Sequence, residues 1–393
     1  MADAGKIKNV ARRIAAAKDK GNQVVVVVSA MGDTTDELIN LAHQISEQPD
    51  SRELDALVST GELVSSTLLA MALEAIGYEA ISLSGAQAGI RTDDAFRQAK
   101  IVKVESRRVV QELKKGNVVI VAGFQGITSN MDVTTLGRGA SDLSAVALAG
   151  SLGAKVCERY TDVAGIYTAD PRIVPEAIPL TEISYEEMLE LATYGSKAVQ
   201  PRAIELAELL GVPIRVASSF VDSPGTLIHG GKSMEVRNKA RSIAHDLDVA
   251  KITVVGVPDR PGIAAALFEP LAKANISVDT IVQNASINNI TDLTFTVAKS
   301  QLDKAMAVAE PIAKSIGARE CVSDSKLGKV SVIGTGMQNT PGYAARMFRT
   351  LSEKGINIQL ISTSEIRITC IIEESQVIDA VRALHRAFEL DKE

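Results

Sequence analysis

The run Thr134–Asp142 brings into nine residues the groups that an anion-binding site needs. It reads Thr-Thr-Leu-Gly-Arg-Gly-Ala-Ser-Asp, so a guanidinium stands between two glycines and is followed by a hydroxyl and a carboxylate. Ser141 or Asp142 could cap the apolar helix that follows, leaving its N-terminal amides free for an anion. A capped helix behind a glycine turn would show the same pattern, but the flanking glycines favour a buried Arg138 that binds a carboxylate or phosphate.

The hydrophobic pattern of residues 1–230 predicts the scaffold that positions this run. β-branched runs alternate with longer amphipathic segments, which is typical of a parallel sheet covered by helices on both faces. The predicted strands are Val24–Ser29, Ala80–Leu83, Val118–Ala122, Lys155–Tyr160 and Pro213–Ala217. The predicted helices are Ile7–Lys20, Asp36–Gln44, Glu62–Ile76, Lys100–Lys114, Ser141–Leu152, Tyr185–Ala192 and Pro201–Leu210. Glycines cluster where strands pass into helices, and we expect the active site at that edge.

Beyond a glycine-rich stretch at Gly225–Gly231 the sequence contains an internal duplication. A strand-like run leads to a Pro-Gly pair, a helix-like run and another strand-like run, and the same order returns later. An offset of 80 residues relates Pro261 to Pro341, Phe268 to Phe348 and Ile276 to Ile356. This repeated unit indicates two copies of one small domain. Each copy resembles an ACT domain, a ferredoxin-like module that binds amino acids where its first loop meets a neighbouring module.

Composition limits the function classes. The 393 residues include 42 basic and 48 acidic residues, a net charge of −6, and only 3% are aromatic, which argues against nucleic acid or an anionic membrane as a partner. Cys157, Cys321 and Cys370 are far apart and only four histidines are present, so we expect buried thiols and no metal site. No signal peptide or apolar run of membrane-spanning length is recognised, which predicts a soluble cytoplasmic protein.

The run Thr134–Asp142 resembles a motif of the aspartokinases of the amino-acid kinase superfamily, with Ala140 where the family has glycine. Further segments match that family in the same order: Val25–Asp36, Ser59–Glu62, Ala122–Gly126 and Tyr160–Arg172. The resemblance implies an α/β amino-acid kinase fold, a mostly parallel sheet sandwiched by helices, followed by two ferredoxin-like ACT domains. It places the catalytic domain at residues 1–230 and the ACT domains at 249–320 and 321–393. In this family one module is inserted within the other, so residues 240–248 are expected to add a strand to the second.

Aspartokinases transfer the γ-phosphoryl group of ATP to the β-carboxylate of L-aspartate, and the resemblance implies this reaction. A carboxylate is already a nucleophile, so the site must bring two anions together and stabilise charge rather than supply a general base. Cations, backbone amides and Mg²⁺ carried on ATP would serve this purpose, with no metal ligands from the protein. The scarcity of histidine agrees with that requirement.

The resemblance assigns roles around aspartate. Arg138 would bind its α-carboxylate and Glu62 its ammonium group. The pocket would be lined by Phe124, Gly139, Ser141 and Asp142, with Asp142 organising neighbouring cations. Two ordinary interpretations compete with these roles: Glu62 could be a solvated carboxylate on the first turn of a helix, and Phe124 could belong to the core.

For ATP, the resemblance assigns adenine, ribose and phosphate contacts to Thr161, Asp162, Tyr167 and Arg172. Lys197 would neutralise phosphate charge, and it completes the expected catalytic set with Arg138 and Asp142. In the alternative interpretation the segment is an irregular loop with Tyr167 packed and Arg172 solvated, and Lys197 is simply exposed.

The ACT resemblance predicts amino-acid effector sites that sense threonine, lysine or both, in modules that pair across a homo-oligomer. In the first module the expected residues are Asp259, Gly262, Ala264 and Gln283, and in the second Asn357, Ile358, Thr363, Ser364 and Glu365. Asp259 could equally be a turn residue before Pro-Gly.

One departure from the family concerns the opening strand. Aspartokinases begin with Lys-x-Gly-Gly-Thr-Ser, whose lysine contacts ATP, whereas this chain starts with Met1–Val10, which resembles the stretch after that strand. The main hypothesis is an aspartate kinase at the feedback-regulated first step of lysine, threonine and methionine synthesis, with little activity in the chain as written. The alternative is a catalytically silent sensor subunit. Another amino-acid kinase, for glutamate or acetylglutamate, is disfavoured by the paired ACT modules.

Overall fold

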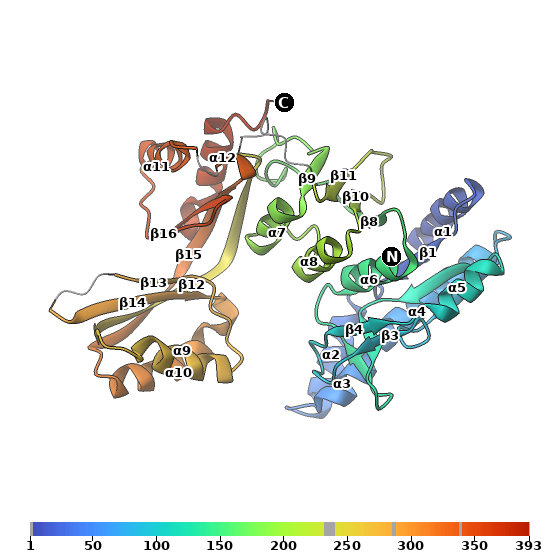
Figure 1. Cartoon of the computed structure of the whole chain (residues 1–393), viewed down its shortest axis with the longest axis horizontal. Coiled ribbons are helices and arrows are strands. Elements are labelled where there is room, and N and C mark those ends of the chain that lie inside the picture. Colours follow the sequence, from blue (N-terminus) through green and yellow to red (C-terminus); the bar gives the residue numbers. More distant parts are fainter. Residues whose placement is uncertain (1–2, 232–239, 285–287, 338–339, 393) are drawn as a thin grey trace. The chain divides into compact units, whose positions relative to one another are not determined.

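The computed structural model describes residues 3–231, 240–284, 288–337 and 340–392, and the chain forms two compact units (Figure 1). The first unit contains Met1–Ile166, Leu180–Ala192 and Lys197–Lys232. The second contains Tyr167–Pro179, Thr193–Ser196 and Ser233–Glu393. Two short segments from the part of the sequence that resembles the kinase therefore pack with the part that carries the duplication.

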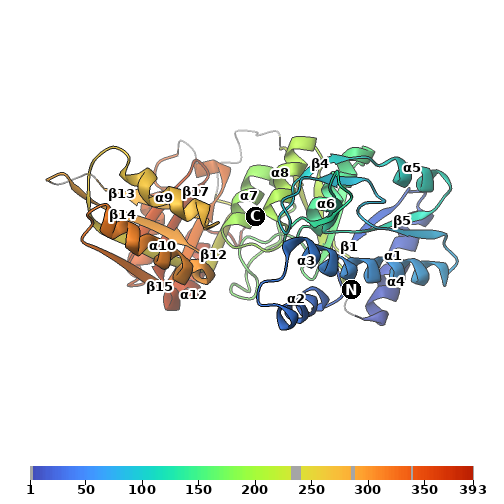
Figure 2. The same ribbon diagram turned by 90° about the horizontal axis from the view of Figure 1, so that it is seen from below.

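A parallel three-stranded sheet lies at the centre of the first unit, in the order β1 (Val25–Val28), β5 (Val118–Ala122), β2 (Ala80–Leu83). Every residue of β5 is apolar and buried, and successive side chains point to opposite faces. Val118 and Ile120 pack in one cluster with α1 (Ala4–Asp19) and α4 (Thr60–Glu74). Val119 and Val121 pack in another, with α5 (Arg107–Lys114) and α6 (Ser141–Leu152). Figure 2 shows α1 and α4 on one side of β5 and α5 on the other.

Two further sheets complete this unit. One has the order β8 (Cys157–Thr161), β10 (Ile214–Ser218), β11 (Thr226–His229), β9 (Glu182–Ser184). The other has the order β4 (Ile101–Val104), β3 (Ile90–Thr92), β6 (Gln125–Ile127), β7 (Val133–Thr135). The remaining helices are α2 (Thr34–Ile45), α3 (Ser51–Val58), α7 (Tyr185–Thr193) and α8 (Pro201–Leu210). All five predicted strands of this region are present, each within two residues of its predicted ends.

The predicted helix Lys100–Lys114 is wrong in its first half. Residues Ile101–Val104 form β4, which pairs antiparallel with β3, and only Arg107–Lys114 are helical. The β-branched Ile101, Val102 and Val104 favour a strand, and pairing with β3 satisfies their backbone groups. Pairing in the folded protein therefore outweighed the helical pattern.

The expectation that no apolar run reaches membrane-spanning length is also wrong. Among the described residues, one helical stretch, Ser51–Glu74, is long and apolar enough by length and composition, and half of its most apolar 18-residue window is buried inside the structure. Leu69 and Leu73 are fully buried against the central sheet. The stretch thus resembles the core helix of a folded domain.

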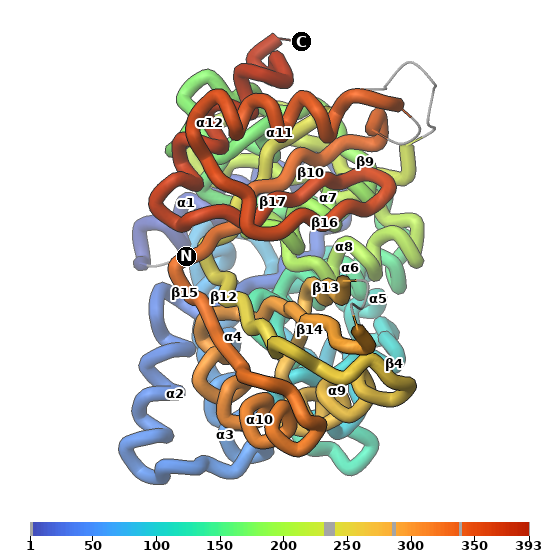
Figure 3. The backbone as a smooth tube through the Cα atoms, turned by 90° about the vertical axis from the view of Figure 1, so that its left-hand side faces the viewer, coloured from blue at the N-terminus to red at the C-terminus, as the bar shows by residue number. Residues whose placement is uncertain are grey.

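The second unit contains one six-stranded antiparallel sheet, in the order β13 (Ile281–Gln283), β14 (Ile290–Val297), β12 (Ser242–Pro258), β15 (Glu320–Ile333), β17 (Arg367–Glu373), β16 (Leu360–Thr363). The long strands β12 and β15 run through both halves. Helices α9 (Ile263–Lys273) and α10 (Leu302–Ser315) pack on the first half, and α11 (Tyr343–Glu353) and α12 (Val377–Ala387) on the second (Figure 3). Residues Ser242–Asp246 of β12 pair with Lys329–Ile333 of β15, so the stretch 240–248 enters the sheet beside the second half.

The duplication is visible as equivalent helices. Ile263–Lys273 and Tyr343–Glu353 are both 11 residues long and keep the 80-residue offset. The residue before each helix is a glycine in the left-handed region, with φ of 91° at Gly262 and 108° at Gly342. A side chain would be strained there, so each Pro-Gly pair specifies how the chain turns into its helix.

The three cysteines are free thiols. Cys157 and Cys370 are buried, and this burial raises the pKa of each thiol to about 12. Cys321 is only partly buried, so the expectation of a buried thiol is met at two positions of the three.

Candidate active site

The ends of β1 and β5 meet the start of α6 at one edge of the central sheet. The hydroxyl of Ser29, directly after β1, lies 2.9 Å from that of Ser141, the first residue of α6. Gly123 follows β5, and a Cβ atom there would lie 2.9 Å from Ser141 Cβ and 2.8 Å from a methyl of Val27. Glycine therefore permits the helix to approach the strand ends, as expected at the ligand-binding edge of such a sheet.

Glu62 is the most unusual charged residue at this edge. It lies in the first turn of α4 and is only 3% exposed, so the solvated alternative is wrong. The amide of Ala30 donates to Oε1 at 3.1 Å, and Oε2 is buried with no hydrogen-bond partner among the described residues. Burial raises the pKa of Glu62 to about 7. A buried carboxylate oxygen without a partner is costly, and a cationic ligand would satisfy it.

Arg138 is not buried as the sequence led us to expect. Its side chain is 83% exposed, and Nη2 lies 2.6 Å from Oδ1 of Asp36 in α2. Gly137 and Gly139 on either side have positive φ, so the loop takes a course that few other residues would adopt. An exposed ion pair of this kind contributes little to stability, and the guanidinium is free to exchange its carboxylate partner.

The predicted side-chain cap of α6 is also wrong. The residue before the helix is Ala140, and neither Ser141 nor Asp142 acts as its N-cap. Both oxygens of Asp142 instead accept from Nε of Arg159 in β8 at 2.9 Å, and Oδ2 also accepts the amide of Gln200 at 3.2 Å. Asp142 thus holds one cation and the chain before α8, while Nη1 of Arg159 is buried without a partner among the described residues.

Phe124 supports both interpretations of its role. It is 9% exposed and has a φ of 67°, which is unusual for an aromatic residue. Its amide donates to the Ser144 hydroxyl at 3.1 Å, and its carbonyl accepts from the Leu136 amide at 2.9 Å. The backbone at the end of β5 is therefore tied to α6 and to the loop that carries Arg138.

The residues expected to bind the nucleotide are divided between the two units. Thr161 and Asp162 end β8 in the first unit, with the Thr161 hydroxyl 2.9 Å from Asp162 Oδ1, and Lys197 is exposed before α8. Tyr167 and Arg172 belong to the second unit. Tyr167 is half-buried against its core, and Arg172 is 87% exposed and paired with Asp170 at 2.7 Å. In this structure the packed Tyr167 and the exposed Arg172 correspond to the alternative interpretation of this segment.

The residues expected at the effector sites lie on loops and strand ends of the second unit. Asp259, Gly262, Ala264 and Gln283 are all exposed, and the Asp259 amide donates to Asn289 at 2.8 Å. In the second half Asn357 and the stretch Thr363–Glu365 are exposed, and Ile358 packs partly against the core. Their roles remain predictions.

Sequence reasoning missed three residues that the structure places beside the predicted ones. Ser29 contacts Ser141, Asp36 pairs with Arg138, and Arg159 pairs with Asp142. An arginine in the middle of a strand was the only local signal for Arg159. Ser29 and Asp36 lie within the segment Val25–Asp36 that resembles the family, but they are more than 100 residues from Ser141 and Arg138, so no local pattern indicated these contacts.

Comparison with known proteins agrees with this architecture. The profile of the amino acid kinase family matches residues 1–218, and that of the ACT domain matches residues 252–310 and 330–388. The chain is thus a kinase of the amino acid kinase class with tandem ACT domains.

Relatives identify the family within that class. An aspartate kinase of Stutzerimonas stutzeri is 49% identical over 387 residues, which cover 98% of this chain and 94% of the relative. An aspartokinase of Mycolicibacterium smegmatis is 48% identical over 395 residues, covering 99% and 94%. The chain belongs to the aspartokinase family.

Solved structures show the same fold. The aspartate kinase from Synechocystis is 43% identical, with a TM-score of 0.54 over 99% of this chain and 68% of that one. Aspartokinase III of E. coli in complex with lysine and aspartate is 25% identical, with a TM-score of 0.71 over 93% and 92%. The same E. coli enzyme in complex with aspartate and ADP gives a TM-score of 0.81 at 24% identity, a likeness of fold.

Proposed function

We propose that this chain transfers the γ-phosphoryl group of ATP to the β-carboxylate of L-aspartate, forming 4-phospho-L-aspartate. The observation that carries the proposal is the buried Oε2 of Glu62, which has no partner among the described residues and suits the ammonium group of an amino acid. It lies in the unit that also presents Ser141, Gly123 and Arg138 around the strand ends. Because the chain belongs to the aspartokinase family, we take this amino acid to be L-aspartate.

The reaction needs charge neutralisation more than proton transfer. The aspartate β-carboxylate attacks the γ-phosphorus and ADP leaves, so no group must remove a proton from the nucleophile. We assign the α-carboxylate of aspartate to Arg138, the phosphate charge to Lys197, and the adenosine to Thr161, Asp162, Tyr167 and Arg172. Asp142 keeps Arg159 beside the first turn of α6. Mg²⁺ enters as part of the MgATP substrate.

The ACT modules fit a feedback role. Aspartokinase III of E. coli has been crystallised with lysine, and we propose lysine, threonine or both as effectors here, bound near Gln283 and near Thr363. Such regulation suits the first step of lysine, threonine and methionine synthesis. We further propose a cytoplasmic enzyme that assembles as a homo-oligomer through its ACT modules.

The direct test is the product. Purified protein, MgATP and L-aspartate are incubated with hydroxylamine, which traps aspartyl phosphate as a hydroxamate, and L-glutamate replaces aspartate as a control. Hydroxamate formed with aspartate alone supports the proposal. Absence of hydroxamate together with retained lysine or threonine binding would instead indicate a silent sensor subunit.

Glu62→Gln tests the residue that carries the argument. Loss of the buried carboxylate should raise the aspartate KM by about 10- to 150-fold, because a charge-assisted hydrogen bond is worth roughly 1.5–3 kcal/mol. Glu74→Gln, an exposed glutamate at the other end of the same helix, should leave KM unchanged. A KM that Glu62→Gln does not alter would place the ammonium group elsewhere.

A further inference from the structure

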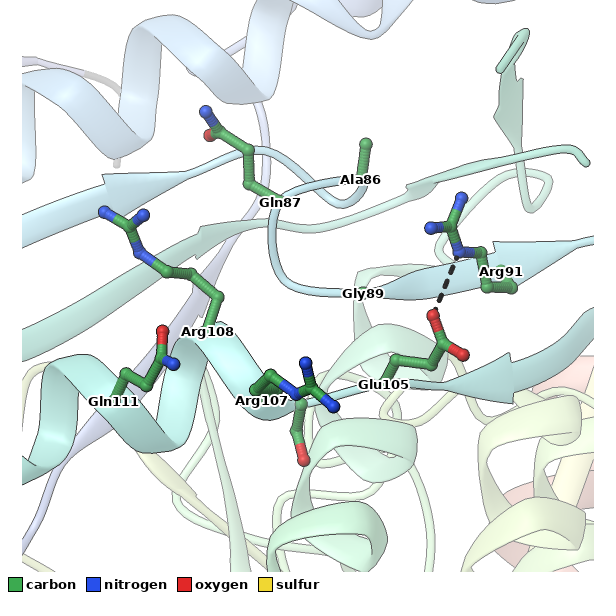
Figure 4. Close-up of a pocket in the computed structure, with 9 residues that line it drawn as sticks. Ala86, Gln87, Gly89, Arg91, Glu105, Arg107, Arg108 and Gln111 are labelled. Carbon is green, nitrogen blue, oxygen red and sulfur yellow. Dashed lines mark hydrogen bonds and ion pairs between the residues drawn. The ribbon is translucent and has the colours of Figure 1, made fainter. Parts of the chain in front are cut away.

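A pocket in the first unit is lined by none of the residues discussed so far. Its volume is about 580 Å³, and it is formed by the turn after β2, the strand β3, the link between β4 and α5, and the first turns of α5. Figure 4 shows Arg108 and Gln87 on one side and Arg91 with Glu105 on the other, with Gly89 between them. No aromatic residue lines it.

The wall of this pocket is positively charged on a protein that is negative as a whole. Arg91, Arg107 and Arg108 line it against the single carboxylate of Glu105, while the chain has a net charge of −6. Glu105 is shared, because it pairs with Lys103 at 3.0 Å as well as with Arg91 at 3.4 Å. The Lys103 hydrogen bond is the largest of the effects that lower the pKa of Glu105. The carboxylate of Glu105 therefore neutralises only part of the positive charge around the pocket.

The guanidinium groups are only partly used by the protein. Arg108 pairs through Nε with Glu112 at 2.9 Å. The side chains of Arg107 and Gln111 make no hydrogen bond or ion pair within the described part of the chain. Donors of three arginines therefore remain available around one cavity.

The position of the arginines on α5 is unfavourable for the helix itself. Arg107 and Arg108 are its first two residues, and no acidic residue lies in its first turn. The partial positive charge of a helix N-terminus repels cations, so two arginines there reduce stability. Proteins tend to keep residues that destabilise their local structure at functional sites, so this unfavourable position of the two arginines indicates a function.

The frame behind the arginines is rigid. The Glu105 amide donates to the Gly89 carbonyl at 2.8 Å, and β3 and β4 pair antiparallel from Ile90 and Val104 onward. A Cβ atom on Gly89 would lie only 2.1 Å from the Glu105 carbonyl oxygen. Glycine is therefore required for this close approach, which holds Glu105, directly after β4, within reach of Arg91 in β3.

We propose that this pocket binds a small phosphorylated metabolite that carries hydroxyl groups and no aromatic ring, such as a sugar phosphate. The planar guanidinium of arginine binds phosphate oxygens in pairs, and Arg91, Arg107 and Arg108 supply that chemistry. Gln87, Ser106 and Gln111 supply groups that hydrogen-bond to hydroxyls. The volume lies within the range of small-molecule sites, and the absence of an aromatic wall disfavours a nucleobase.

Calorimetric titration of the full chain tests this proposal, with glucose 6-phosphate, inorganic phosphate and glucose as probes. Excess ADP blocks binding of the probes at the nucleotide site. Constant ionic strength keeps electrostatic screening the same for every probe. We expect saturable binding of glucose 6-phosphate and none of glucose. Weaker binding of inorganic phosphate supports a phosphate ester, and equal binding of the two would overturn the sugar part of the proposal. Failure of both phosphate probes to bind would overturn all of it.

Arg107→Ala is the decisive variant, because it removes a guanidinium that makes no hydrogen bond or ion pair in the described structure and should leave folding intact. It should weaken the binding of glucose 6-phosphate by roughly tenfold, equivalent to about 1.4 kcal/mol. Arg107→Lys should recover part of this affinity. Arg12→Ala, at an exposed arginine on α1 whose side chain donates to Asn9, is the matched control. Unchanged affinity in Arg107→Ala would overturn the assignment, whatever the kinase assay shows.

Discussion

Thr168 Oγ1 and His385 Nε2 lie 2.9 Å apart, although 217 residues separate them in the sequence. Both side chains are buried in the second unit, Thr168 at 3% exposed and His385 at 0%. Ala169, Val174 and Ala177 pack beside them in the core with residues of β15, β17, α11 and α12. The stretch Tyr167–Pro179, which follows Thr161 and Asp162 in the chain, thus packs in the same unit as the second ACT domain.

Thr168→Val should destabilise the protein by about 1–3 kcal/mol, because His385 and the Ile178 amide, which donates to the Thr168 hydroxyl at 3.1 Å, would both lose a buried partner. Chemical denaturation followed by circular dichroism measures this. Thr67→Val, at an exposed threonine on α4, serves as the control. A variant as stable as the parent would show that this contact contributes nothing.

Stability should fall in acid in part through His385. Burial lowers its pKa, while Asp391 and Glu176 act in the opposite direction and Arg386 adds to the lowering. A histidine with a lowered folded pKa contributes fully above the unfolded value of about 6.5, and that contribution is lost as the pH falls towards the folded value. Burial lowers the pKa of His245 too, so His385→Gln should flatten the melting-temperature profile below about pH 6.5 only in part. An unchanged profile would show that His385 does not titrate in this range.

Arg138→Lys should raise the aspartate KM by roughly 5- to 150-fold. Lysine offers a point charge in place of a planar guanidinium, whose paired hydrogen bonds to a carboxylate contribute about 1–3 kcal/mol of binding free energy. The ATP KM should change little. Asp36→Asn, which removes the charge of the observed partner of Arg138, should alter stability by less than about 1 kcal/mol because the pair is exposed. An aspartate KM that stays at the parent value in Arg138→Lys would remove this residue from the site.

Lys197→Ala should depress kcat, since its charge matters most as the phosphoryl group transfers. We expect a fall of roughly 100-fold with a smaller change in either KM. Lys20→Ala, at an exposed lysine after α1, is the control. A loss confined to the aspartate KM would contradict the assigned role.

Gln283→Ala should relieve inhibition by lysine or threonine while uninhibited kcat stays nearly intact. An effector can inhibit only by binding one conformational state better than another, so removing a contact in that state reduces the coupling. Inhibition curves for the parent and the variant measure it, and Asp259→Ala is the companion variant in the same module. Unaltered sensitivity in both would move the effector site away from this module's first loop.

Elements whose signals are local could be predicted from the sequence alone. The run Val118–Ala122 is apolar throughout, so it had to be a strand buried on both faces. The Pro-Gly pairs and the 80-residue offset determined the two equivalent helices, because only glycine adopts the required backbone readily. Motif resemblance likewise sufficed to name the family before any contact was known.

Features that depend on partners distant in the chain arise only in the folded protein. Strand β4 exists because β3 pairs with it, against a helical local pattern. Glu62 became a buried carboxylate with one oxygen unsatisfied only through the packing of α4, whereas Arg138 came to lie exposed beside Asp36. The placement of Thr168 beside His385 has the same origin, because burial and pairing are set by the whole fold and no local pattern encodes them.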